Sequence, residues 1–144
     1  MKTIHVEAST YCNARCPLCP RSLYGYKVEG VYPEVHLSVQ KFKEALERLP
    51  SREYVYFNGN LGDPIVAKDT LEVFDYFRQH NPNMWLSMNT NGGAKNEEWW
   101  RNLATTFGRM GAVIFSVDGL MDTNHLYRQN VVWDNVERNM RAFI

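Results

Sequence analysis

The sequence predicts a parallel α/β fold built from four successive βα units in one domain. Short runs of β-branched and aromatic residues alternate with stretches whose apolar residues recur at helical spacing. The length of 144 residues, with 44% hydrophobic and 22% charged residues, is ordinary for one globular domain with its own core. Because strands that alternate with helices usually pair in parallel through crossover helices, the pattern predicts a parallel sheet.

The first unit combines a strand over residues 3–7 with a helix that follows a long loop. Ser38 is the expected N-cap of this helix, because its hydroxyl can accept a hydrogen bond from a backbone N–H of the first turn. Apolar residues recur at helical spacing along the helix, at Val39, Phe42, Leu46 and Leu49. Pro50 lacks a backbone N–H and marks the expected end of the helix.

The second unit pairs a strand over residues 54–57 with a helix that Asp69 opens. Glu72 stands three residues after Asp69, the spacing at which an N-cap and an acidic side chain satisfy each other's backbone N–H groups. The residues of this helix that are expected to face the core are Leu71, Phe74 and Phe77. The third and fourth units place strands over 84–88 and 112–117, and helices over 97–107 and 132–143.

Charge and apolar content exclude several classes of partner. The formal net charge is +0 and the basic residues are scattered, so we expect no surface for nucleic acid or an anionic membrane. The N-terminus has no apolar signal core, and no apolar run approaches the roughly 20 residues needed to cross a bilayer. The sequence therefore predicts a cytoplasmic protein with neither nucleic acid nor a membrane as partner.

Three cysteines, Cys12, Cys16 and Cys19, follow the first predicted strand, and the chain has no others. An odd number of cysteines so close together is unsuited to a disulfide framework and favours a metal site in a reducing compartment. A structural zinc site needs four ligands, whereas three thiolates on an iron–sulfur cube leave one iron open to a small molecule. Two alternatives stay open: a zinc site, and three reduced cysteines that pack as small apolar side chains.

Polar or glycine-rich segments follow all four predicted strands. The first is the loop that holds Cys12, Cys16 and Cys19, called the cysteine loop below. The other three segments are residues 58–64, 89–93 and 116–119, and the loops that contain them are called the second, third and fourth loops. In parallel α/β folds, ligands collect at the carboxyl ends of the strands, where loops and helix N-termini converge. We therefore expect the four segments to share one rim and to build one site.

The spacing C-x3-C-x2-C directly after a first strand resembles the signature of the radical SAM superfamily. The resemblance implies that Cys12, Cys16 and Cys19 hold a [4Fe-4S] cluster whose open iron binds S-adenosylmethionine. It also implies an enzyme that takes an electron from a donor, cleaves the cosubstrate to a 5′-deoxyadenosyl radical and abstracts hydrogen from a substrate. Leu18 stands where an aromatic residue commonly lies near the adenine in this family, and it can still pack on the base.

The resemblance extends to the loops after the second and third strands. Gly62 and Asp63 are similar to the end of a glycine-glycine-glutamate element, which implies that they meet the methionine amine. The alternative for Asp63 is a turn held by Asx-type hydrogen bonds. Asn91 belongs to a segment that resembles the family's threonine-asparagine-glycine element, and we expect it to line the cofactor side.

Ser116 and Asp118 belong to a Ser-Val-Asp-Gly segment that is similar to a family element with a downstream arginine, here Arg128. Alternation along the predicted strand puts Ile114, Ser116 and Asp118 on one face, where polar side chains need partners. A bound ribose and carboxylate would supply those partners. Arg128 is expected to pair with the methionine carboxylate, and the alternative is a surface arginine in a loop.

The family's core normally has six βα units. The resemblance therefore implies a partial (β/α)6, TIM-like barrel in which residues 1–144 form a partial core domain and later strands are absent. We expect these residues to be a truncated portion of the core, or a portion that additional chain completes. Because the last strand is unpaired, we expect the protein to be poorly soluble or oligomeric. The signatures favour a peptide or protein substrate. The alternatives are a zinc-binding interaction module closed by His36, and an inactive scaffold that keeps a cluster without turnover.

Overall fold

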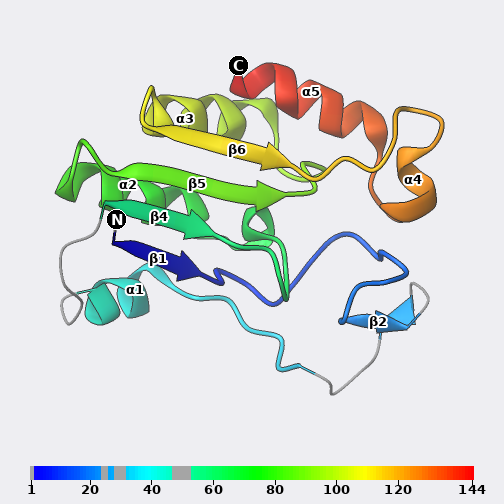
Figure 1. The fold of residues 1–144 in the computed structure, drawn as a ribbon, viewed down its shortest axis with the longest axis horizontal. Helices are drawn as coiled ribbons and strands as arrows, with labels where there is room; N and C mark the ends of the chain where they lie inside the picture. Colours follow the sequence, from blue (N-terminus) through cyan, green and yellow to red (C-terminus); the bar gives the residue numbers. More distant parts are fainter. Residues whose placement is uncertain (1, 24–25, 28–31, 47–52) are drawn as a thin grey trace.

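Four parallel strands form one sheet in the computed structural model, which describes residues 2–23, 26–27, 32–46 and 53–144 (Figure 1). Across the sheet the order is β1 (Thr3–Val6), β4 (Tyr54–Phe57), β5 (Trp85–Thr90) and β6 (Gly111–Phe115). Each strand of this sheet pairs in parallel with the next one along the chain. The predicted parallel α/β fold is confirmed.

The connecting helices lie on one side of the sheet. Because strand order follows chain order, right-handed crossovers put every connecting helix on the same face. In Figure 1, helix α2 (Thr70–His80) lies behind β4 and β5, α3 (Glu97–Phe107) and α5 (Trp133–Phe143) lie side by side above β6, and α1 (Val39–Leu46) lies beside β1. A doubly wound sheet would carry helices on both faces. The chain therefore forms part of a TIM-like barrel.

The hydrophobic core lies between the sheet and the helices. Val55 and Phe57 of β4, with Leu86 and Met88 of β5, are fully buried. The helices contribute the fully buried side chains Phe74, Trp100 and Leu103 and the almost fully buried Phe77. Burial of each such side chain stabilises the fold by about 1.5–3 kcal/mol. This layer fixes the strands, and with them the loops at their carboxyl ends.

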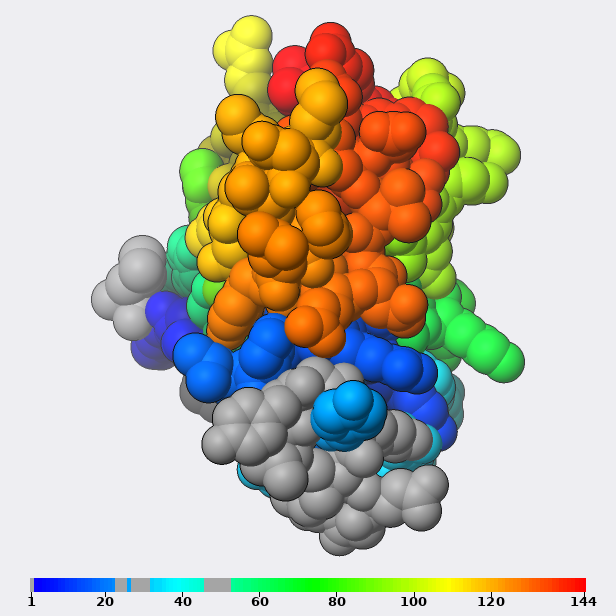
Figure 2. Space-filling model, turned by 90° about the vertical axis from the view of Figure 1, so that its right-hand side faces the viewer, coloured from blue at the N-terminus to red at the C-terminus, as the bar shows by residue number. Residues whose placement is uncertain are grey.

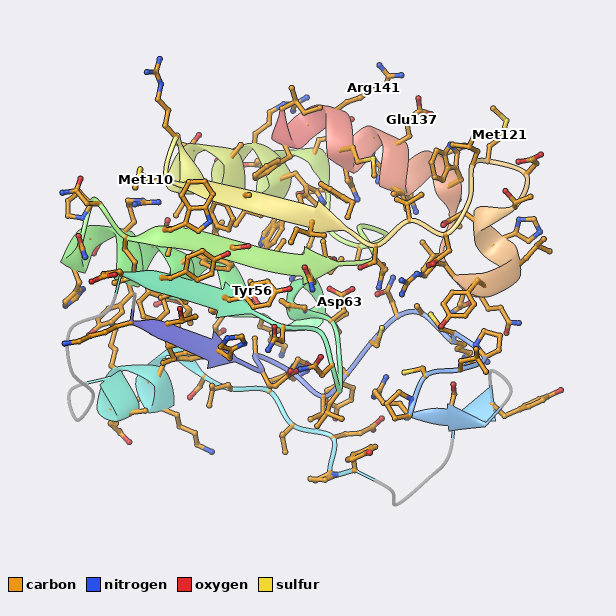
Figure 3. All side chains as sticks on the ribbon, in the orientation of Figure 1. Tyr56, Asp63, Met110, Met121, Glu137 and Arg141 are labelled. Atoms are coloured by element: carbon orange, nitrogen blue, oxygen red, sulfur yellow. The ribbon has the colours of Figure 1, made fainter. Side chains whose placement is uncertain are left out.

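The opposite face of the sheet carries half-buried aromatic side chains. Tyr54 has its ring centroid 6.5 Å from that of Trp85 and 6.4 Å from that of Tyr56, which is labelled in Figure 3. On the same face, Ile114 of β6 is 51% exposed. In a closed β/α barrel this face forms the interior. It is the inner face of the partial barrel.

Strand β4 and helix α3 are confirmed at both predicted ends. Asn96 begins α3, because its Oδ1 accepts a hydrogen bond from the Trp99 N–H at 3.0 Å. The predicted strand over 3–7 ends at Val6, the predicted strand over 84–88 runs instead from Trp85 to Thr90, and the predicted helix over 132–143 begins at Trp133. These shifts leave the alternation toward the core unchanged.

The two predicted helix caps have different outcomes. Ser38 is a cap, because its Oγ accepts the Lys41 N–H at 3.4 Å. Asp69 precedes α2 as predicted, but its side chain makes no cap hydrogen bond there. Its Oδ2 instead accepts the Val39 N–H at 3.2 Å, so the carboxylate ties the start of α1 to the start of α2. The Leu46 side chain, Leu49 and Pro50 lie outside the described residues.

Four short elements were not predicted. All four lie in the loops at the carboxyl ends of the strands. Three of them are the strands β2 (Ser22–Leu23) and β3 (Tyr26–Lys27), which form a hairpin, and helix α4 (Asn124–Tyr127). The fourth is a single 3-10 turn, η1 (Pro64–Val66), which Pro64 and the Asp63 cap start. No helix in the described part of the chain is long and apolar enough to cross a membrane.

Candidate functional site

A cavity of about 330 Å³ lies where the carboxyl ends of the strands meet their loops. This volume is within the range of small-molecule and cofactor sites. All four predicted segments contribute to its lining, with Cys12, Cys16, Cys19, Gly59, Asn60, Gly62, Asp63, Asn89, Thr90, Asn91, Ser116, Tyr127 and Arg128. Figure 2 views this end of the molecule and shows the cysteine loop (blue) against α4 and its flanking residues (orange).

Backbone hydrogen bonds hold the cysteine loop in place. The Cys19 N–H donates to the Cys16 carbonyl at 3.1 Å, and Ser22 Oγ donates to the same carbonyl at 2.6 Å. The Arg15 N–H donates to the Gln129 carbonyl at 2.9 Å, which joins this loop to the segment after β6. The fold thus brings all three thiols to one cavity, as the sequence predicted.

The cysteines differ in burial. Cys16 is 6% exposed, whereas Cys12 and Cys19 are half-buried. Burial raises the pKa of Cys12 to about 11, and burial also raises the pKa of Cys16, although the Arg128 guanidinium lowers it in part. The thiols of Cys12 and Cys16 are therefore protonated at neutral pH without a metal. Metal binding would displace these protons.

Asp63 braces two loops at the centre of the site (Figure 3). Its Oδ1 accepts hydrogen bonds from the Ile65 N–H at 3.2 Å and from Thr90 Oγ1 at 2.8 Å. Its Oδ2 accepts the Asn91 N–H at 2.7 Å and Asn91 Nδ2 at 2.6 Å. Burial raises the pKa of this carboxyl, and these donors partly offset the effect. The Ile65 bond is of the Asx type, and the four donors fill the carboxylate's acceptor positions.

Asn91 connects the hydrogen bonds of Asp63 to the cysteine loop. Its Nδ2 also donates to Asn13 Oδ1 at 2.8 Å and lies 3.7 Å from the Cys12 Sγ. Its Oδ1 accepts the Gly93 N–H at 2.8 Å. Both Asp63 and Asn91 are buried, at 4% and 3% exposure. The second and third loops therefore reach a cysteine sulfur through side chains whose positions are fixed by several hydrogen bonds.

We expect Asp63→Asn to destabilise the fold. The amide would turn an N–H group toward donors, and each buried donor left without a partner costs about 1–3 kcal/mol. Urea unfolding monitored by circular dichroism measures the loss. Asp122→Asn is the matched control, since Asp122 is exposed and such surface changes stay within about 0.5 kcal/mol. Equal unfolding midpoints for wild type and Asp63→Asn would contradict the proposed brace.

The segment after β6 corrects one prediction. The predicted strand over 112–117 ends at Phe115, because the Ser116 N–H makes a last bond to the Thr90 carbonyl and the Val117 N–H turns back to the Phe115 carbonyl. Strand alternation therefore does not place Ser116 and Asp118 on one face. Ser116 lines the cavity, and the exposed Asp118 is ion-paired with Arg128.

Arg128 is not a free surface side chain. Its Nε donates to the Asp118 carboxylate, its Nη1 lies 3.6 Å from the Cys16 Sγ, and its guanidinium lies 5.4 Å from the Tyr127 ring centroid. Burial alone would lower the pKa of Arg128, but the neighbouring Cys16 and Asp118 side chains raise it overall. Arg128 therefore keeps its positive charge beside the cysteine loop.

Gly62 permits the second loop to touch the cysteine loop. A Cβ at this position would lie 2.0 Å from the Ser9 carbonyl oxygen and 2.7 Å from the Tyr11 carbonyl oxygen. The next residue, Asp63, donates its N–H to the Tyr11 carbonyl at 2.8 Å. Only glycine fits this contact between two backbones.

Asn13 and Tyr127 were not predicted as site residues, and Asn89 was predicted only as a member of the segment over 89–93. Asn89 lines the cavity, and its Oδ1 is buried without a hydrogen-bond partner among the described residues. Its place directly after the predicted strand over 84–88 was a usable signal. Nothing in the sequence near Asn13 indicates its contact with Asn91, which lies 78 residues away. Tyr127 is the sequence neighbour of Arg128, and its place in the cavity depends on the folding of helix α4.

In the structure, His36, the residue expected to close a zinc site, is engaged with other residues. His36 Nδ1 is 2.9 Å from Ser9 Oγ, and its ring stacks on Tyr11 with a centroid distance of 4.4 Å. Within the described ranges, no group of three or more histidine, cysteine, aspartate or glutamate side chains is arranged to hold a single metal ion. Three thiolates of one loop instead fit the donor set of an iron–sulfur cluster.

A family model described as the radical SAM superfamily matches residues 6–144. A comparison with curated proteins found no match. Among solved structures, native anSMEcpe with bound AdoMet is similar at TM-score 0.72 and 21% identity, over 98% of this chain and 40% of that one. The same protein with AdoMet and Kp18Cys peptide gives 0.72 and 22%, over 98% and 40%.

A further solved structure is BtrN in complex with AdoMet and 2-DOIA, at TM-score 0.66 and 19% identity, over 96% of this chain and 55% of that one. At these identities the likeness shows the fold alone. The chain spans 40% to 55% of the length of these solved structures.

Proposed function

The chain belongs to the radical SAM superfamily, and from this premise we propose that Cys12, Cys16 and Cys19 bind a [4Fe-4S] cluster that acts on S-adenosylmethionine. One observation carries the proposal: three thiols of one loop line a cavity at the carboxyl ends of the strands. Three thiolates leave one iron for the cosubstrate. When bound, such a cluster supplies the electron that breaks the sulfur–C5′ bond and yields a 5′-deoxyadenosyl radical.

We assign two roles to the predicted cosubstrate residues. Ser116 and Arg128 line the cavity and are proposed to contact the cosubstrate, together with Leu18, which is 78% exposed and free to cover a base. The remaining residues act on the shape of the cavity. Gly62, Asp63 and Asn91 hold the second and third loops against the cysteine loop, and Asp118 holds Arg128.

We also propose a substrate class and a setting for the reaction. Residues 1–144 are proposed to supply the first four units of a six-unit core, and a peptide or protein is the proposed substrate. Support for a peptide comes from the Kp18Cys complex of the structurally similar anSMEcpe. The reaction needs an electron donor, and an oxygen-sensitive cluster fits the reducing cytoplasm.

Anaerobic reconstitution with iron and sulfide tests the proposed function. We expect a brown protein with absorbance near about 400 nm, the region in which thiolate-bound clusters absorb. After S-adenosylmethionine and dithionite are added, chromatography should detect 5′-deoxyadenosine. A colourless protein with one zinc per chain would support the interaction module. That colourless protein would overturn the proposal. A brown protein without product would keep the cluster assignment and point either to the inactive scaffold or to a need for the missing half of the barrel.

Asn89→Leu is expected to have opposite effects on stability and on binding. The substitution removes a buried acceptor that has no partner among the described residues, so the metal-free protein should gain about 1 kcal/mol of stability. If Asn89 Oδ1 accepts a hydrogen bond from the cosubstrate, the dissociation constant should rise about tenfold. Urea unfolding and calorimetric titration of the reconstituted protein measure the two effects. An unchanged affinity would remove Asn89 from the binding site.

A further inference from the structure

The guanidinium of Arg128 lies against Cys16, one of the three proposed cluster ligands, whereas the cosubstrate is proposed to bind the iron that has no cysteine ligand. Resting on the proposed function, we propose that Arg128 donates a hydrogen bond to the Cys16 thiolate and thereby raises the reduction potential of the cluster. Arg128 is then a positioning and tuning residue of the cluster, in addition to any contact that it makes with the cosubstrate.

Three contacts fix the guanidinium in its position. Nε is bound by the Asp118 carboxylate, Nη1 points to the Cys16 Sγ at 3.6 Å, and the Tyr127 ring lies 5.4 Å from the guanidinium carbon. The side chain of Arg128 is only 22% exposed, so solvent screens its charge weakly. The rigid fork of an arginine presents separate N–H groups to the carboxylate and to the sulfur in a fixed geometry.

Neighbouring backbone contacts keep Arg128 beside the cysteine loop. The Arg15 N–H donates to the Gln129 carbonyl at 2.9 Å, and Asn130 Nδ2 donates to the Asn13 carbonyl at 3.0 Å. These bonds are made by the two residues that directly follow Arg128, and they lie on both sides of Ala14 in the cysteine loop. The contact with Cys16 is therefore part of a docked interface between two loops.

The expected sign follows from charge. Reduction adds one electron to a cluster that already carries negative thiolates, so a fixed positive donor at a sulfur stabilises the reduced state more than the oxidised state. Arginine has five N–H groups, and the contacts with Asp118 and Cys16 engage two of them. The others stay able to meet a carboxylate, so the two roles of Arg128 do not exclude each other.

The test is a redox titration of the reconstituted protein, followed by electron paramagnetic resonance without S-adenosylmethionine. We expect Arg128→Gln to lower the equilibrium constant for one-electron reduction about tenfold, which is about 59 mV. Arg15→Gln is the matched control, since it removes a positive charge from an exposed residue of the cysteine loop. Its effect should be clearly smaller. Equal potentials for wild type and Arg128→Gln would overturn the inference.

Other outcomes separate the inference from the proposed function. A wild-type protein that binds no iron would overturn the proposed function. A variant with an unchanged potential but weaker binding of S-adenosylmethionine would overturn only the inference. If Arg128→Gln fails to fold, pulsed electron paramagnetic resonance decides, on a protein that carries Arg15→Gln and Arg21→Gln and is labelled with ¹⁵N-arginine. Arg21 is replaced because it also lines the cavity. A nitrogen coupling to the reduced cluster is expected, and its absence would overturn the hydrogen bond.

Discussion

Cys16→Ala should abolish the cluster while leaving the fold in place. A cluster held by two thiolates has lost one of its three protein ligands, so we expect iron and the absorbance near about 400 nm to be lost. The fold should persist, because the loop is held by backbone bonds such as the Cys19 N–H to the Cys16 carbonyl, which alanine keeps. Iron analysis and visible absorption after anaerobic reconstitution measure the loss, and far-ultraviolet circular dichroism measures the helices.

Leu18→Ala is the matched control for this experiment. Leu18 lies in the same loop and is 78% exposed, but it has no metal-binding atom. Its variant should retain wild-type iron content in the absence of S-adenosylmethionine. A Cys16→Ala protein with an unchanged visible spectrum would contradict the ligand assignment.

Gly62→Ala should displace the cysteine loop from the second loop. The new Cβ would lie 2.0 Å from the Ser9 carbonyl oxygen, a backbone atom that cannot rotate away. Overpacking of this kind costs about 1–3 kcal/mol and occasionally more, and relief requires the two backbones to separate. We therefore expect a lower free energy of unfolding and poor retention of iron, measured by urea unfolding and iron analysis.

Gly108→Ala separates this steric effect from the general cost of replacing a glycine. Gly108 ends α3 with φ +53, and the nearest atom to a new Cβ is the Thr105 carbonyl oxygen at 3.9 Å. The substitution should cost about 1–3 kcal/mol, because φ 53 with ψ −136 is a backbone conformation that residues with a Cβ rarely adopt, and it should leave the iron content unchanged. Full iron content in Gly62→Ala would contradict the proposed role of the close contact.

Local signals predicted the fold because they act within a few residues. Strand β4 alternates apolar and aromatic residues, and Asn96 stands directly before the amphipathic helix α3, so both elements were predicted at both ends. The end of β6 was wrong by two residues, since Ser116 and Val117 leave the ladder through backbone bonds that alternation does not encode. The Asp69 cap failed because Val39, 30 residues away, competes for its carboxylate.

The sequence was enough to predict where the site lies, but it predicted few of the contacts between its side chains. The cysteine spacing, with the carboxyl ends of parallel strands, was enough to bring Cys12, Cys16 and Cys19 to one cavity. The contact of Arg128 with Cys16 was not predictable, because Cys16 lies 112 residues away in the sequence. The brace at Asp63 also depends on donors from another loop. Short motifs specify which residues gather, and packing specifies what each residue touches.

The most direct test of the central claim is the electron paramagnetic resonance of the reduced, reconstituted protein before and after S-adenosylmethionine is added. A cluster held by Cys12, Cys16 and Cys19 alone leaves one iron for the cosubstrate. We predict the signal of a reduced [4Fe-4S] cluster that changes on addition of the cosubstrate. A protein without such a signal, or a signal that S-adenosylmethionine leaves unchanged, would contradict the claim.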